Sequence, residues 1–106
     1  NIEIIFRQQR SAGSIAHGEA LDLLVSKVET DYFVVMDSDA VFLKKCWDEI
    51  LISSLNEKVK VVGSTLPIEN ANKKPCDFPM VFAALFETAT FMKMNASFKP
   101  GNLIID

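Results

Sequence analysis

The chain has 106 residues, of which 49% are hydrophobic and 24% charged, and its formal net charge is −3. This length allows one small domain with a modest core, and the composition is typical of a globular protein rather than a disordered or fibrous one. The acidic balance argues against a nucleic-acid-binding protein, which would normally present a basic face. No stretch approaches the roughly 18 consecutive apolar residues that indicate a membrane span.

Apolar runs and helical patterns alternate along the first part of the chain. Residues 2–6 predict a short strand. Apolar side chains at steps of four over residues 15–28 predict a helix, with Ser14 as its N-cap. Residues 32–36 predict a strand covered on both faces, because their apolar run shows no polar alternation.

The rest of the chain continues this alternation. One apolar stripe indicates a second helix, and prolines and polar residues separate the later apolar runs. We expect a helix over residues 43–55, strands over 60–66 and 80–86, a loop over 68–77, a short helix over 88–94 and a last strand over 103–105.

This order of elements predicts an α/β fold. Strands that alternate with helices form a layered sheet with helices on both faces, and the first crossovers should be parallel and right-handed. The chain opens and closes in strand-like runs, "IEIIF" and "NLIID". We therefore expect it to be a segment of a longer protein.

Two carboxylates stand where the strand over residues 32–36 ends. Asp37 and Asp39 are separated by one serine, and ligands of α/β sheets bind at the carboxyl ends of strands. Residues two apart on an extended chain point the same way, so both carboxylates can face one pocket. Two like charges there repel each other unless a cation such as Mg²⁺ or Mn²⁺ neutralises them. The alternative is a strand-end turn in which an aspartate caps the next helix.

A longer pattern surrounds these carboxylates. It consists of a glycine, a helix rich in small residues, an apolar strand and the Asp-x-Asp, and it resembles the donor-binding half of family-2 glycosyltransferases with the GT-A fold. The resemblance is clear over residues 2–66 and loose beyond them. The matching residues are Gly13, His17, Gly18, Glu19, Ala20, Leu21, Thr30, Asp31, Tyr32, Asp37, Ser38 and Asp39, and "VFLKKCWDEIL" resembles the helix that follows.

The resemblance implies a fragment of a GT-A sheet, which is layered in a Rossmann-like manner. Residues 1–106 would form a single partial domain, a donor-binding core without the family's first strand and C-terminal acceptor region.

The resemblance also implies roles for individual residues. Asp39 would bind the metal, and Asp37 would contact the ribose, the sugar or, through water, the metal. Arg10, with Arg7 as its rival, would pair with phosphate, and His17 would lie in the donor pocket. The alternatives are a solvated Arg10 and a hydrogen-bonded structural His17.

The implied reaction is the metal-dependent, inverting transfer of a sugar from a UDP- or GDP-sugar to a hydroxyl of a glycan or a lipid-linked acceptor. Mn²⁺ or Mg²⁺ is the expected cofactor, and no nucleic acid is expected as a partner. The catalytic base is not assigned, and Glu87 and Asp106 are the late acids that could be considered. The expected compartment is the cytoplasm, with membrane association through other parts of the parent protein left open.

Two other functions remain open. In haloacid-dehalogenase-like phosphatases an Asp-x-Asp also follows an apolar strand, and its first aspartate is a nucleophile. Those enzymes need a later acidic pair for Mg²⁺, and their motif usually stands near the domain start, whereas a strand and a helix precede "DSDAV" here. The third function is a nucleotide-sugar-binding domain without a catalytic base.

Overall fold

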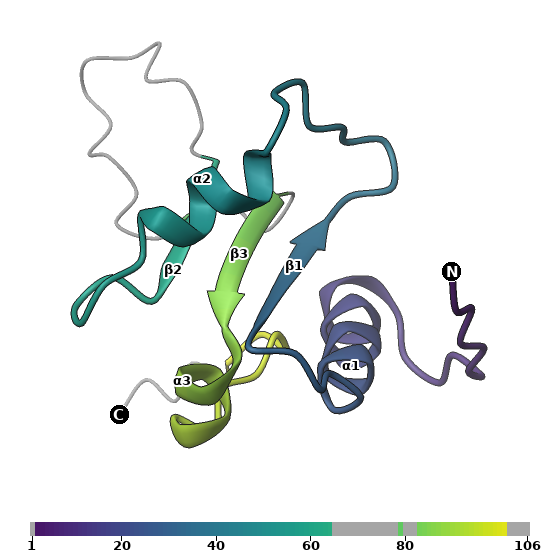
Figure 1. Cartoon of the computed structure of the whole chain (residues 1–106). Helices are drawn as coiled ribbons and strands as arrows, with labels where there is room; N and C mark the ends of the chain where they lie inside the picture. Colours follow the sequence, from purple (N-terminus) through teal and green to yellow (C-terminus); the bar gives the residue numbers. More distant parts are fainter. Residues whose placement is uncertain (1, 65–78, 80–82, 102–106) are drawn as a thin grey trace, which may run out of the picture.

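The computed structural model describes residues 2–64, 79 and 83–101, which combine helices with a small sheet (Figure 1). This mixture agrees with the predicted α/β class. In chain order the elements are α1 (Gly13–Val25), β1 (Tyr32–Met36), α2 (Trp47–Ser53), β2 (Val61–Gly63), β3 (Ala83–Glu87) and α3 (Thr88–Lys93).

The three strands form one sheet in the order β1-β3-β2. β3 runs antiparallel to both neighbours, and its register sets Glu87 opposite Tyr32 and Ala83 opposite Met36. β1 and β2 therefore run in the same direction without pairing. The crossover from β1 through α2 to β2 is therefore parallel, as expected, although the third strand lies between the two. The direction of β3 has a simple cause: no helical pattern separates β2 from β3, and strands joined without a crossover helix pair antiparallel.

The pleat of the sheet turns alternate side chains to two faces. On one face, Val25 of α1 packs with Phe33 and Phe86 in a buried cluster. α2 lies against the other face, where its Ile52 shares a cavity wall with Leu85. Covering on both faces explains why β1 shows no polar alternation in the sequence.

Aromatic rings form much of the core. Phe33 and Phe86 stack with their ring centroids 5.0 Å apart, and Phe91 of α3 meets both rings edge-on. Phe98, from the loop after α3, stacks on Phe91 at 5.2 Å. Aromatic pairs of this kind contribute about 0.5–1.5 kcal/mol each beyond their buried area. The cluster thus joins β1, β3, α3 and the following loop into one unit.

The loop after α3 is held against α1 at two points. The Asp22 carboxylate accepts hydrogen bonds from the Phe98 backbone N–H at 2.8 Å and the Ser97 hydroxyl at 2.5 Å. One helical turn earlier, a Cβ on Gly18 would lie 2.5 Å from the Phe98 carbonyl oxygen and 2.6 Å from the Lys99 Cα. Gly18 is therefore needed here because the two backbones touch.

Gly18→Ala should destabilise the protein by roughly 1–3 kcal/mol, because the added methyl group forces two backbones apart. Urea denaturation followed by circular dichroism measures this change. The matched control is Gly101→Ala, whose added Cβ meets nothing within 4 Å. Equal stability of the two variants would show that α1 does not approach the loop this closely.

Two sequence expectations about the first half of the chain are wrong in detail. The segment over residues 2–6 is not a strand, and Ile2 and Phe6 are 93% and 89% exposed. A short apolar run forms a strand only beside a neighbouring strand, and no described strand pairs with this segment. α1 begins at Gly13, so Ser14 lies inside its first turn, and Ala12 takes the N-cap position without a side-chain hydrogen bond.

The second helix is shorter than expected. α2 begins at Trp47 instead of residue 43, because Cys46 adopts the left-handed conformation with φ 59°, which interrupts a helix. Trp47, the first residue of the helix, is half-buried. The predicted loop over 68–77, the last strand over 103–105 and parts of the strands over 60–66 and 80–86 lie outside the described residues.

Candidate functional site

The two motif carboxylates lie in a tight turn at the end of β1. The backbone N–H of Ala40 donates to the Asp37 carbonyl oxygen at 3.0 Å, so Ser38 and Asp39 are the central residues of a β-turn. Both aspartates are exposed, and neither carboxylate makes a hydrogen bond or ion pair with any residue that the structure describes.

This geometry changes one step of the sequence argument. The side chains of residues two apart point the same way on an extended chain, and this relation does not hold for Asp37 and Asp39 in a turn. The turn also bears on the structural alternative. An aspartate that stabilises a turn normally accepts a hydrogen bond from a nearby backbone amide. The Asp37 side chain accepts none from the described residues, so the turn forms without help from either carboxylate.

The turn lies at a sheet edge where two strands end together. Because β1 and β2 run in the same direction, Met36 and Gly63 both end at the edge where β3 begins. The Ser64 backbone N–H donates to the Ala83 carbonyl oxygen at 3.0 Å and holds the end of β2 against β3. Neighbouring strands lie about 4.8 Å apart, so the ends of β1 and β2 are separated by roughly 10 Å.

The donor set of the turn suits a hard divalent cation that is completed by a ligand. Mg²⁺ is typically bound by one or two carboxylates together with phosphate oxygens and water, and Mn²⁺ shares this preference for oxygen. Within residues 2–64, 79 and 83–101, no group of three or more His, Cys, Asp or Glu residues could hold a metal ion. Asp37 and Asp39 can supply the two carboxylates of such a site, and a bound phosphate ligand and water would supply the remaining oxygens.

Arg10 and His17, the other candidates, make no hydrogen bond or ion pair with the turn in the part of the chain that the structure describes. Both are exposed. His17 lies in the first half of α1, which runs roughly opposite to β1 because only six residues join the two elements (Figure 1). The start of α1 is therefore on the same side of the molecule as the end of β1, although neither side chain contacts Asp37 or Asp39.

Arg7, the rival of Arg10, has a structural partner. Its guanidinium donates to the Glu19 carboxylate at 3.0 Å, and the Ser11 hydroxyl donates to the same oxygen at 3.1 Å. These two hydrogen bonds, the one from Arg7 first, hold the pKa of Glu19 below its usual value. Arg7 and Glu19 thus tie the segment before α1 to that helix, which leaves Arg10 as the better candidate for an anion.

Glu87, one of the late acids considered as a base, lies at the opposite edge of the sheet. It pairs with Tyr32, at the far end of β1 from Met36, and five residues of strand span roughly 13 Å. Its carboxylate accepts hydrogen bonds from the Thr90 hydroxyl at 2.5 Å and the Lys60 ammonium at 3.1 Å. Glu87 is therefore a structural residue remote from the turn, and Asp106 lies outside the described residues.

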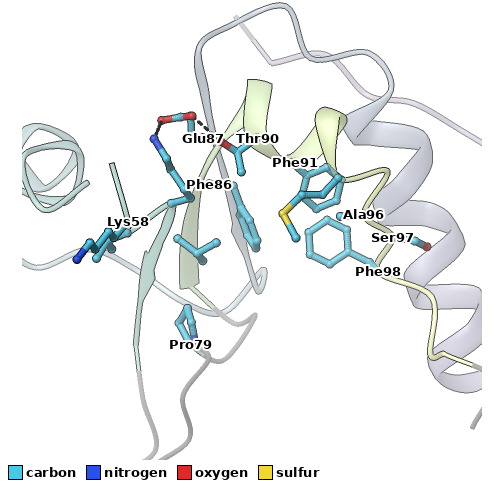
Figure 2. A pocket seen from close by; sticks show the side chains of 13 residues that line it. Lys58, Pro79, Phe86, Glu87, Thr90, Phe91, Ala96, Ser97 and Phe98 are labelled. Carbon is cyan, nitrogen blue, oxygen red and sulfur yellow. Dashed lines mark hydrogen bonds and ion pairs between the residues drawn. The ribbon is translucent and has the colours of Figure 1, made fainter. Parts of the chain in front are cut away.

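A cavity of about 550 Å³ lies beside Glu87, between β2, β3, α3 and the loop after α3 (Figure 2). Its walls are mainly apolar, with Phe86, Phe91 and Phe98 on one side, and Glu87 with Thr90 at its rim. No sequence pattern indicated a cavity at this place. Because the cavity lies at the Glu87 edge, it is separate from the turn at residues 37–40.

Comparison with known proteins gives no match: no family model, no curated protein and no solved structure is significantly similar to the chain. None of the helices in the described part of the chain is long and apolar enough to cross a membrane. The function of the turn must therefore be inferred from its residues and its geometry.

The hydrogen bonds on Glu87 should make folding stability sensitive to acid. The Thr90 hydroxyl first, and then Lys60, hold the pKa of Glu87 below its ordinary value of 4.5. A lowered folded-state pKa contributes stability that is present above 4.5 and is lost as the pH falls through the lowered value. Glu87→Gln should therefore flatten the acid limb of a plot of urea midpoint against pH.

The control for this measurement is Glu57→Gln, which changes an exposed glutamate without a hydrogen bond or ion pair among the described residues. Its acid limb should match that of the unmodified chain. A Glu87→Gln limb as steep as the control's would contradict the hydrogen-bonded arrangement.

Proposed function

We propose that the chain carries part of the donor site of a glycosyltransferase, in which Asp37 and Asp39 hold Mn²⁺ or Mg²⁺ against the diphosphate of a UDP- or GDP-sugar. One observation carries the proposal: two exposed carboxylates, free of bonds to the described residues, follow a buried strand directly. Carboxylates that are exposed and bonded to no described residue keep their oxygens open to a divalent cation, which would offset the repulsion between them.

The two aspartates of the turn have different proposed roles. Asp39, at the third position of the turn, is the proposed direct ligand of the cation, and Asp37 contacts the ribose, the sugar or a metal-bound water. When bound, the cation would offset the negative charge that develops on the leaving diphosphate. Inversion at the sugar then requires that the acceptor hydroxyl approach from the side opposite this diphosphate.

Arg10 and His17 complete the proposed donor side. Arg10 can pair with a phosphate through two parallel N–H donors, a mode of binding that fits a charged and mobile diphosphate. His17 contributes a donor or an acceptor to the sugar or nucleotide. Both side chains are exposed and able to move towards a ligand at the end of β1.

The proposed fold is a piece of a GT-A domain. It is supported by the common direction of β1 and β2, by helices on both faces of the sheet and by the resemblance of residues 2–66. We assign no catalytic base to the described residues, because Glu87 is bonded to Lys60 and Thr90 at the opposite edge. The chain is accordingly proposed as the donor side of the enzyme, with the acceptor and its base held elsewhere.

Isothermal titration with Mn²⁺ and a panel of UDP- and GDP-sugars tests the donor site. At least one nucleotide sugar should bind in a metal-dependent manner, and Asp39→Asn should weaken this binding at least about tenfold because a charged ligand is lost. The matched control is Asp48→Asn, an exposed aspartate on α2, which should bind as the unmodified chain does.

Three outcomes decide between the functions. Metal-dependent binding that survives in Asp39→Asn would contradict the proposed site. A covalent phosphate on Asp37, detected by mass spectrometry after incubation with a phosphoryl donor, would favour a phosphatase. Binding without transfer to any acceptor, measured on the full-length parent, would favour a nucleotide-sugar-binding domain.

A further inference from the structure

The loop between the turn and α2 exposes large apolar side chains. Val41 is 76% exposed and Leu43 is 96% exposed, the latter the highest value among the large apolar residues that the structure describes. Between them, Phe42 points back and stacks on Trp47, with 3.7 Å between ring centroids and nearly parallel planes. The stacked pair ties the loop to the start of α2, whereas Val41 and Leu43 remain exposed.

Two lysines follow these apolar residues immediately. Lys44 and Lys45 are both exposed, and neither makes an ion pair with a described residue. An isolated exposed apolar residue is ordinary on a protein surface. Here two such residues lie on one loop and are followed directly by two lysines without an ion pair among the described residues. This arrangement is unfavourable in water, and an apolar phase with a negatively charged surface would stabilise both parts of it.

We infer that residues 41–45 dock on an anionic phospholipid membrane, with Val41 and Leu43 inserted at the boundary of headgroups and acyl chains and Lys44 and Lys45 among the headgroups. Interfacial protein segments combine apolar anchors with lysines in this way, and each element alone binds weakly. This surface goes beyond the proposed function, and its existence does not depend on the donor site.

The charge around the loop fixes how it can approach a membrane. The chain as a whole carries a net charge of −3, and acidic residues lie on both sides of the loop: Asp37 and Asp39 in the turn before it, and Asp48 and Glu49 in the first turn of α2. Attraction to an anionic surface is therefore confined to Lys44 and Lys45, which must arrive before the flanking acids. Because the lysines are exposed, salt should screen this attraction strongly.

The position of the loop has a consequence for the acceptor, and this step rests on the proposed function. Val41 is two residues from Asp39, a distance of at most about 7 Å along the chain. Insertion of Val41 would place the proposed metal site at the membrane surface. Of the two acceptor classes, a lipid-linked acceptor presents its hydroxyl there, whereas a soluble glycan does not.

Vesicle flotation tests the docking surface. The chain should float with vesicles of phosphatidylcholine and phosphatidylglycerol and remain largely unbound with phosphatidylcholine alone. The double variant Val41→Ser with Leu43→Ser should lower the partition coefficient at least about tenfold, since two apolar anchors are lost. Lys44→Gln with Lys45→Gln should lower it roughly tenfold at low salt and remove the preference for phosphatidylglycerol.

Two controls distinguish docking by residues 41–45 from non-specific adsorption of exposed apolar residues and from binding at the donor site. Ile2→Ser with Ile4→Ser removes two apolar residues that are 93% and 69% exposed and should leave flotation unchanged. Asp39→Asn should float at least as well as the unmodified chain, because it removes a negative charge beside the loop, so failure of docking and failure of the donor site are distinguishable.

The inference is overturned if the unmodified chain does not float with either vesicle, or if the isoleucine control loses as much binding as the Val41 and Leu43 variant. It is equally overturned if light scattering shows that these two residues hold a dimer that dissociates on substitution. Near-ultraviolet circular dichroism of the variants should match the unmodified chain, because all four side chains are exposed.

Discussion

The antiparallel pairing of β3 between β1 and β2 is the constraint on which the rest of the structure depends. Ala84, Leu85 and Phe86 of β3 are 0–3% exposed, so this strand forms the centre of the core. Because β3 opposes both neighbours, β1 and β2 must end at the same edge. The pairing thereby sends the turn with Asp37 and Asp39 to one edge of the sheet and Glu87 to the other.

The two edges consequently have different characters. At the Glu87 edge, an aromatic cluster and the hydrogen bonds of Glu87 fix the structure. At the other edge, the carboxylates and the loop that follows them contribute little to the described packing. Residues that are not needed for stability are available for ligands, and this separation supports placing both the proposed donor site and the membrane surface at the second edge.

Sequence reasoning succeeded where the local pattern was sufficient. The strand over residues 32–36 has the predicted bounds, because an apolar run closed by polar residues leaves few alternatives. The apolar run over residues 2–6 also predicted a strand, and this prediction is wrong. A strand needs a neighbouring strand to pair with, and the local sequence does not show whether one is present. The antiparallel direction of β3 was not predicted, although no helical pattern separates this strand from β2. The turn of residues 37–40 could not be decided from the sequence, since Asp-x-Asp suits both extended and turning backbone. The need for glycine at position 18 could not be predicted from the sequence, because it arises from contact with the loop after α3.

The central claim, that the turn after β1 holds a divalent cation against a diphosphate, is tested most directly by paramagnetic broadening in nuclear magnetic resonance. Mn²⁺ added with UDP to the labelled chain should broaden the amide signals of Asp39 and Ala40 most, that of Ser64 at the same edge less, and those of Tyr32 and Glu87 at the far edge least. Broadening centred on Asp31 and Asp48, or spread evenly over the chain, would contradict the account.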